Sequence, residues 1–173
     1  AKDIALLWVA RCQPIKRPHL FLDLAARLPE ARCVMICPDE DRALWDTLES
    51  RARTLPNVEF LRRVPYHEIQ HYYDRAEIFV NTSEAEGFPN SFIQAAQGGA
   101  AILSLEVDPD TVLTRYGAGW CASGDVEKFF GEAARLRRDP VALGALQARA
   151  SQFVTELHDT AKNVDAFLAG LTR

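Results

Sequence analysis

Short, continuous runs of apolar residues alternate along the chain with longer segments of helical periodicity. Five such runs predict strands: Ile4–Val9, Cys33–Cys37, Val58–Leu61, Glu77–Val80 and Ala100–Leu103. Because most of these runs are apolar throughout and rich in β-branched residues, they are typical of parallel strands that are buried on both faces.

The segments between the runs repeat apolar residues every three to four positions, as amphipathic helices do. The first helix is expected to begin near Pro18, which suits a first helical turn, and to end at Pro29. Others are expected over Asp39–Arg53, after Pro65 and from about Pro89. The apolar stripes that define the first helix and two C-terminal ones are Leu20, Phe21, Leu24, Ala25 and Leu28; Val126, Phe129, Phe130, Ala133 and Leu136; and Phe153, Leu157, Val164, Phe167 and Leu171. The last stripe suits either core packing or docking onto another domain.

Strands that alternate with helices predict an α/β fold with right-handed crossovers. The expected architecture is a Rossmann-like, doubly wound parallel sheet of about six strands, with helices on both faces and C-terminal helices. In such sheets ligands bind beyond the carboxyl ends of the strands. That rule indicates four loops: Arg11–Arg17, Arg62–Tyr66, Ser83–Asn90 and Ser104–Thr111.

Composition narrows the classes of protein. The 173 residues are 48% hydrophobic and 25% charged, which predicts one globular domain over residues 1–173. The net charge of -4 gives no support to nucleic-acid binding. The sequence has neither a signal peptide nor eighteen consecutive apolar residues, so we expect no membrane span. The first residue is Ala and not Met, and it lies very close to the first predicted strand, which suggests a fragment of a longer protein.

The four cysteines carry little functional signal. Cys12, Cys33, Cys37 and Cys121 do not form a C-x-x-C pair, and three of them lie in or beside apolar runs. They are interpreted as buried free thiols, which favours a reducing, cytoplasmic location.

Two cations follow the first strand. Arg11 and Lys16 flank a short loop at its carboxyl end and could converge on one anion, although surface cations are more often simply solvated.

A second group of polar residues follows the fourth strand. Glu84 and Glu86 precede Gly87-Phe88-Pro89, after which the next helix begins. Gly87 could adopt a backbone conformation closed to other residues, Pro89 suits a first helical turn, and the free N–H groups there favour phosphate. A carboxylate beside a phosphate site needs another role, so Glu86 is a candidate for binding sugar hydroxyls. Glu84 or Glu86 could instead be a helix cap.

In this order the motifs resemble the C-terminal domain of retaining glycosyltransferases of family 4, which have the GT-B fold. The resemblance lies in Trp8 to Lys16, in the E-G-F-P turn with the helix up to Ala96, and in further matching segments. Those segments are Asn57–Leu61, Ile78–Ser83, Ser104–Asp110 and Gly117–Gly119.

The resemblance implies a site for a UDP- or GDP-sugar. Arg11 and Lys16 would hold the diphosphate and Glu86 the sugar hydroxyls, as the catalytic residues. The other implied donor contacts are Gly87, Phe88, Pro89, Asn90 and Ser91 for phosphate and sugar, Gln94 for ribose, and Arg62, Arg63 and Val64 near the base. No metal or other cofactor is implied. An N-terminal domain that is absent here would carry the acceptor site and any peripheral membrane association, so the isolated domain is expected to be inactive.

Three positions depart from the family pattern. The family has two glutamates with seven residues between them, whereas this chain has Glu86 and Gln94. Gln94 keeps an acceptor oxygen but loses the charge, which weakens hydrogen bonds to a diol. Arg62 stands where the family often has glycine, and Cys37–Glu40 replaces small residues.

Other functions remain open. A non-catalytic nucleotide-binding or interaction module would follow if these departures have spoiled the donor site. His67-Glu-Ile-Gln-His71 matches H-E-x-x-H, in which two histidines bind zinc and Glu68 activates water, although no third ligand is evident. A GT-B epimerase or phosphorylase is an alternative within the same fold.

Overall fold

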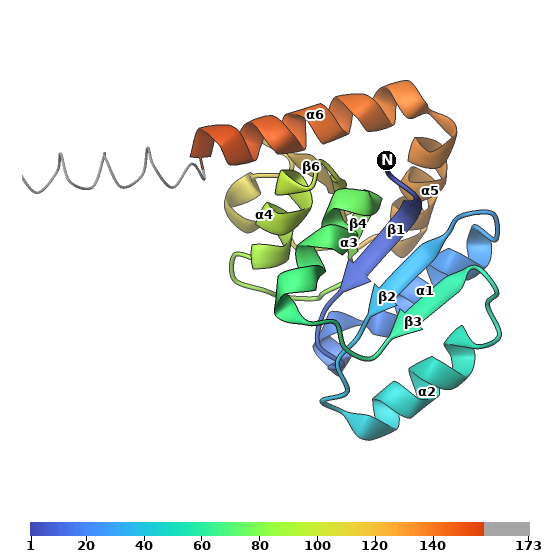
Figure 1. Cartoon of the computed structure of the whole chain (residues 1–173). Helices are drawn as coiled ribbons and strands as arrows, with labels where there is room; N and C mark the ends of the chain where they lie inside the picture. The colour runs from blue at the N-terminus through green and yellow to red at the C-terminus, as the bar shows by residue number, and fades with distance from the viewer. Residues whose placement is uncertain (158–173) are drawn as a thin grey trace, which may run out of the picture.

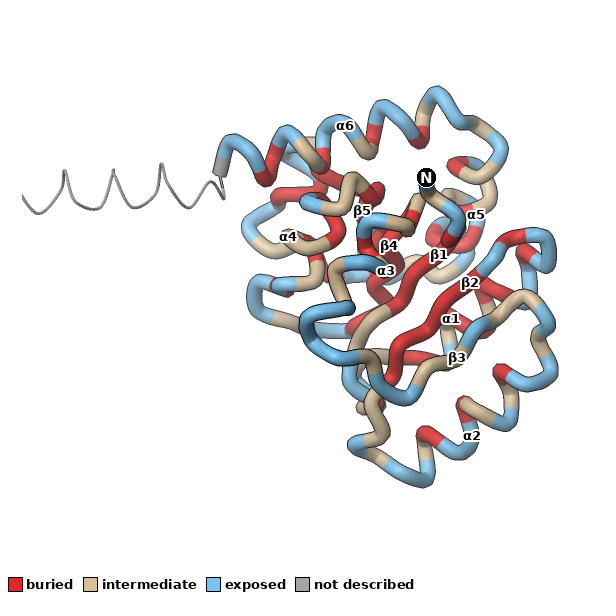
Figure 2. The backbone as a smooth tube through the Cα atoms, viewed as in Figure 1, coloured by how far each residue is buried: buried red, intermediate tan, exposed pale blue. Residues whose placement is uncertain are grey.

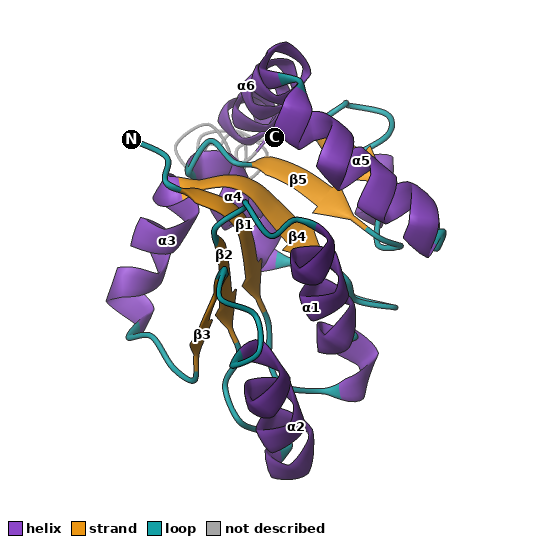
Figure 3. Cartoon of the chain, turned by 90° about the vertical axis from the view of Figure 1, so that its right-hand side faces the viewer, coloured by secondary structure: helices purple, strands orange, loops and turns teal. Residues whose placement is uncertain are grey.

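A computed structural model of the chain describes residues 1–157, which form a six-stranded parallel sheet covered by helices on both faces (Figures 1 and 3). Neighbouring strands follow the order β3-β2-β1-β4-β5-β6. The strands are β1 (Ile4–Val9), β2 (Cys33–Ile36), β3 (Val58–Leu61), β4 (Ala76–Asn81), β5 (Ala101–Ser104) and β6 (Gly119–Cys121). The order reverses between β1 and β4, and ligands bind at such a switch point in doubly wound sheets.

Within residues 1–157, six α-helices connect and cover these strands. They are α1 (Pro18–Arg27), α2 (Arg42–Ala52), α3 (Ile69–Arg75), α4 (Asn90–Gln97), α5 (Val126–Arg138) and α6 (Pro140–Leu157). Three short 3₁₀ helices are η1 (Pro14–Lys16), η2 (Tyr66–Glu68) and η3 (Pro109–Thr111). Within the described residues no helix combines the length and apolar character that a membrane crossing requires.

The sheet divides the apolar core into two clusters. One contains buried side chains of α1, α2 and α5, and the other contains those of α3 and α4 (Figure 3). Helix α6 contributes to both, since Leu146 belongs to the first cluster and Phe153 to the second. The central strands β1 and β4 are almost entirely buried (Figure 2). The loops that follow β1 and β4 therefore extend from strands that are buried in the core.

The predicted doubly wound fold is confirmed. The five apolar runs all become strands, whereas β6 was not located because its three residues, Gly-Trp-Cys, form no apolar run. A Cβ on Gly119 would lie 2.6 Å from the carbonyl oxygen of Ile102, so glycine permits this strand to pair closely with β5.

Other sequence predictions need small corrections. Helix α2 begins at Arg42 and not at Asp39, because the Asp41 carboxylate caps it by accepting from Leu44 N at 3.0 Å. Phe153 packs in the core, as expected for the C-terminal stripe. The predicted stripe positions Val164, Phe167 and Leu171 lie outside the described residues.

The cysteines are free thiols, as predicted. Cys12, Cys33 and Cys37 are buried and Cys121 is half-buried. Burial disfavours the thiolate and raises the pKa of Cys33 to about 12. Neutral, buried thiols of this kind are unreactive.

Candidate functional site

The loops after β1 and β4 are joined where the strand order reverses. Glu84 N donates to Ile15 O at 2.9 Å, which ties the β4–α4 loop to η1. The Thr82 hydroxyl accepts from the Trp8 indole at 2.9 Å and donates to Lys16 O at 2.6 Å. The backbone of Lys16 is thereby fixed to the core.

Lys16 and Glu86 face each other across these two loops. Lys16 Nζ lies 3.2 Å from Glu86 Oε2, and their side chains are only 13% and 17% exposed. The other carboxylate oxygen, Oε1, accepts from Asn81 Nδ2 at 2.9 Å. The structure thus brings together two of the three residues that the sequence nominated as catalytic, and it adds Asn81. The one signal in the sequence that could have indicated Asn81 is its position directly after the predicted fourth strand, Glu77–Val80.

Arg17 is a second residue that sequence reasoning missed. It lies in the left-handed region (φ 46, ψ 50), which is uncommon for a residue with a side chain. Its Nε donates to Thr82 O at 2.8 Å, and Nη2 donates to Ser83 O at 3.0 Å and to Glu106 at 2.7 Å. The Arg17 guanidinium therefore connects the loops that follow β1, β4 and β5 through hydrogen bonds.

The start of α4 is open to a ligand. Pro89 is the N-cap (φ -73, ψ 119) and no side chain caps the helix, so the prediction that Pro89 lies inside the first turn is corrected by one residue. Gly87 was expected in a conformation closed to other residues, and this is wrong because its φ is not in the left-handed region. A Cβ on Gly87 would meet nothing within 4 Å. The space beside this turn is free.

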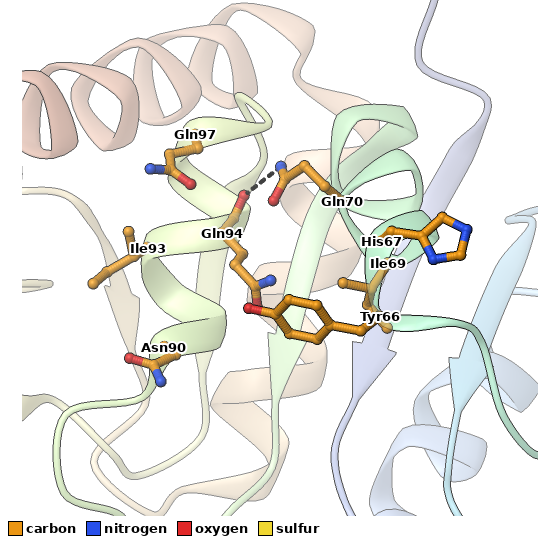
Figure 4. Close-up of a pocket in the computed structure, with 8 residues that line it drawn as sticks. All are labelled: Tyr66, His67, Ile69, Gln70, Asn90, Ile93, Gln94 and Gln97. Atoms are coloured by element: carbon orange, nitrogen blue, oxygen red, sulfur yellow. Dashed lines mark hydrogen bonds between the residues drawn. The ribbon is translucent and has the colours of Figure 1, made fainter.

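Two cavities of about 520 Å³ each adjoin α4 and share the residues Tyr66, Ile69 and Gln94. This volume is within the range of small-molecule sites. The first is otherwise lined by His67, Gln70, Asn90, Ile93 and Gln97, and the second by Val9, Arg63, Val64 and Pro65. Figure 4, which draws the first cavity, shows the Tyr66 ring directed toward the Gln94 carboxamide. Asn90, Gln94, Arg63 and Val64, which the sequence nominated, thus line one continuous region.

Two predicted cations point elsewhere. Arg11 is 62% exposed and its Nε lies 3.8 Å from Glu40 Oε1, so it does not converge with Lys16 on one point. Arg62 Nη2 lies 2.5 Å from Asp39 Oδ2, and this hydrogen bond holds the pKa of Asp39 below its usual value. Two departures from the family pattern, Arg62 and the Cys37–Glu40 segment, are therefore partners in one ion pair.

The histidine motif lacks the geometry of a zinc site. His67 and Glu68 belong to η2, whereas His71 lies in α3, so the two histidines are not on one continuous α-helix. His67 Nε2 lies 3.5 Å from Glu68 Oε1, and Figure 4 shows the His67 ring pointing away from Gln94. In residues 1–157 no three His, Cys, Asp or Glu side chains gather closely enough to hold a metal. The motif gains no support here.

The fold and the site define a class of protein, an α/β domain with a six-stranded parallel sheet and cavities beside α4. A family described as "Glycosyl transferases group 1" matches residues 3–139, and the chain belongs to this family. A search of curated protein sequences found no significant match.

Solved structures agree on the fold. HepE of Anabaena, in complex with UDP, matches with a TM-score of 0.83 and 16% identity over 99% of this chain and 49% of its own. Sucrose-phosphate synthase from Thermosynechococcus elongatus matches at 0.80 and 17% identity, over 98% and 46%. The C-terminal domain of the group 1 glycosyl transferase LpcC from Francisella tularensis matches at 0.80 and 16%, over 92% and 88%. The chain thus has the fold of a GT-B C-terminal domain and spans about half of HepE.

Proposed function

We propose that the chain is the donor-binding domain of a retaining glycosyltransferase of family 4. It moves a sugar from a UDP- or GDP-sugar to a hydroxyl group of a glycan, lipid or small molecule. The observation that carries this proposal is the mostly buried pair of Lys16 and Glu86. Glu86 lies in the loop that leads into the uncapped start of α4, and Asn90 and Gln94 of that helix line a cavity.

This arrangement suits a diphosphate joined to a sugar. The Lys16 ammonium has three N–H donors, and one directed at Glu86 leaves two for phosphate oxygens. The free N–H groups at the start of α4 add to this anion site. Glu86 keeps lone pairs to accept from sugar hydroxyls, so one pair of residues serves both halves of the donor.

Arg11 can join the site at small cost. Its exposed contact with Glu40 at 3.8 Å is of a kind worth about 0–1 kcal/mol, so the side chain can turn toward a bound diphosphate. Arg11 and Lys16 would then stabilise the negative charge that develops on the departing diphosphate. These cations serve in place of a metal, and no cofactor is needed.

The nucleoside occupies the region around Gln94. Gln94 hydrogen-bonds the ribose hydroxyls, and the segment Arg62–Val64 lies along the base. Support comes from the cavity that Gln94 lines together with Val64 and Arg63. The backbone of Gly87–Ser91 contacts phosphate and sugar, where a Cβ on Gly87 would meet open space.

Acceptor binding and any catalytic base belong to a second, N-terminal domain. The greater length of HepE and of sucrose-phosphate synthase supports this part of the proposal. The whole enzyme works in the cytoplasm, with any peripheral membrane association made by that domain. The 173-residue chain alone is expected to bind nucleotide weakly and to transfer nothing, and measurable transfer would contradict this division of labour.

Calorimetric titration of UDP, GDP and ADP into the chain tests the proposal. We expect binding of UDP or GDP, with the preferred base identified by the lower Kd. No binding of any nucleotide at millimolar concentration would favour a non-catalytic interaction module, in which the Arg62–Asp39 pair and Gln94 have closed the donor site. Stoichiometric zinc in the purified protein would favour the hydrolase alternative at His67, Glu68 and His71.

A further inference from the structure

We propose that Asn81 is a positioning residue that fixes the Glu86 carboxylate in the orientation that receives the donor sugar. The inference rests on the proposed function and extends it to a residue that does not itself touch the substrate. Asn81 is the last residue of β4 and only 5% exposed, and its Nδ2 donates to Glu86 Oε1. Both polar atoms of its side chain are hydrogen-bonded.

The hydrogen bonds of Asn81 determine which way its amide faces. Oδ1 accepts from Ser83 N at 3.0 Å, which leaves Nδ2 as the group directed at Glu86 Oε1, 2.9 Å away. A flipped amide would set Nδ2 against the Ser83 N–H group and oxygen against the carboxylate, and both contacts would be repulsive. The turn after β4 therefore determines that the Nδ2 group of Asn81, and not its Oδ1, faces Glu86.

The backbone of Asn81 is equally fixed. Its carbonyl oxygen accepts from Leu105 N at 2.8 Å, and Asn81 pairs with Ser104 in the β4–β5 ladder. Lys16, the other partner of Glu86, carries its ammonium at the end of a flexible four-carbon chain. The Lys16 ammonium shares its donors between Glu86 and the diphosphate, whereas the Nδ2 group of Asn81 is directed at the carboxylate.

This arrangement leaves Glu86 prepared for a ligand. A carboxylate has about four acceptor positions, and Asn81 and Lys16 use one on each oxygen. The remaining positions face away from these two donors and can accept from sugar hydroxyls. Because the Asn81 amide is neutral, it orients Glu86 without neutralising the charge that strengthens those hydrogen bonds.

The variant Asn81→Asp tests this role, because it preserves size and can still accept from Ser83 N. It sets a second carboxyl group at hydrogen-bonding distance from Glu86, and two carboxylates this close cannot both ionise freely. The readout is the ratio of Kd for UDP to Kd for UDP-glucose, and for GDP to GDP-mannose, by calorimetry between pH 5 and pH 8. This ratio isolates the contribution of the sugar.

We expect the ratio in Asn81→Asp to fall about tenfold relative to wild type at pH 8 and to recover toward pH 5, where the shared proton restores a donor to Glu86. Affinity for the free nucleotide should change little. The double variant Asn81→Asp/Glu86→Gln has one carboxylate and should lose the pH dependence. Ser104→Ala is the matched control, since its buried hydroxyl has no hydrogen-bond partner among the described residues and its removal should leave the ratio unchanged.

Three results would overturn the inference. An unchanged ratio at every pH, or equal losses for nucleotide and nucleotide sugar, would mean that Asn81 is only structural. Equal wild-type affinity for the two forms would mean that Glu86 does not meet the sugar, although nucleotide binding would stand. Absence of all nucleotide binding would instead overturn the proposed function together with this inference. Urea unfolding of each variant verifies that it is folded.

Discussion

Lys16 Nζ lies 3.2 Å from Glu86 Oε2, although the two residues belong to the loops after β1 and β4. Both side chains are largely shielded from solvent, and removal of one member of such a pair leaves the other charge uncompensated. The pair therefore links the anion-binding half of the site to the sugar-binding half, which makes Lys16 the first residue to change.

Lys16→Met should weaken binding of UDP or GDP by about 1.5–3 kcal/mol, the value of a charged hydrogen bond. Arg11→Met should have a smaller effect, because Arg11 must first leave Glu40 and order an exposed side chain. Lys128→Met on α5 removes the same charge from a position that is 73% exposed and should change the Kd little. Isothermal titration of the three variants measures this order, and equal affinities throughout would remove both cations from the site.

Arg17 should respond differently to alanine and to glycine. Arg17→Ala removes three hydrogen bonds and keeps the left-handed backbone, so we expect a loss of about 2–3 kcal/mol in the free energy of unfolding. Arg17→Gly removes the same bonds but adopts φ 46 without strain, and should be about 1 kcal/mol more stable than the alanine variant. Urea denaturation compares the two. A glycine variant less stable than the alanine variant would argue against this backbone conformation.

Gln94→Glu should strengthen nucleotide binding. A carboxylate accepts from a ribose diol about 1 kcal/mol better than a carboxamide does, which is about fivefold in Kd. Gln97→Glu introduces the same charge into the same cavity at another point and serves as the control. If both variants shift the Kd for UDP equally, then general electrostatics and not ribose contact explains the change.

Replacing two glycines by alanine, one directly after α4 and one inside α6, should have opposite effects on stability. A Cβ on Gly98, directly after α4, would lie 2.6 Å from the Tyr73 carbonyl carbon, so Gly98→Ala must push α3 and α4 apart and should cost about 1–3 kcal/mol. Gly144 in α6 has no atom within 4 Å of such a Cβ, so Gly144→Ala should stabilise the domain by about 0.4–1 kcal/mol. Thermal unfolding distinguishes them, and a stabilising Gly98→Ala would contradict the close packing of α3 on α4.

The fold could be predicted from sequence because five of the strands described in residues 1–157 lie in short, mainly apolar runs, whereas the three-residue β6 forms no such run. Lys16 and Glu86 could be placed in the site because parallel strands deliver their following loops to one edge. The roles of Arg17 and Asn81 could not be predicted in this way. The role of Arg17 depends on its own left-handed backbone conformation, and the role of Asn81 depends on the direction in which its side-chain amide faces.

The partners of the exposed cations were equally hidden from the sequence. Asp39 and Glu40 reach Arg62 and Arg11 only through the conformation of the loop after β2. The sequence predicts that Gly87 adopts a backbone conformation closed to other residues. In the structure its φ is not left-handed, and the space that a Cβ would occupy is open. Pattern alone cannot distinguish these two uses of glycine.

The central claim is that a nucleotide diphosphate binds between Lys16, the start of α4 and Gln94. Chemical-shift mapping of the ¹⁵N-labelled chain during titration with UDP and with GDP tests it directly. The account predicts that the largest shifts are those of the backbone amides of Gly87, Asn90, Ser91 and Val64, with Arg32 and Asn57 at the opposite edge of the sheet unchanged. Shifts confined to that opposite edge, or no shifts with either nucleotide at millimolar concentration, would contradict it.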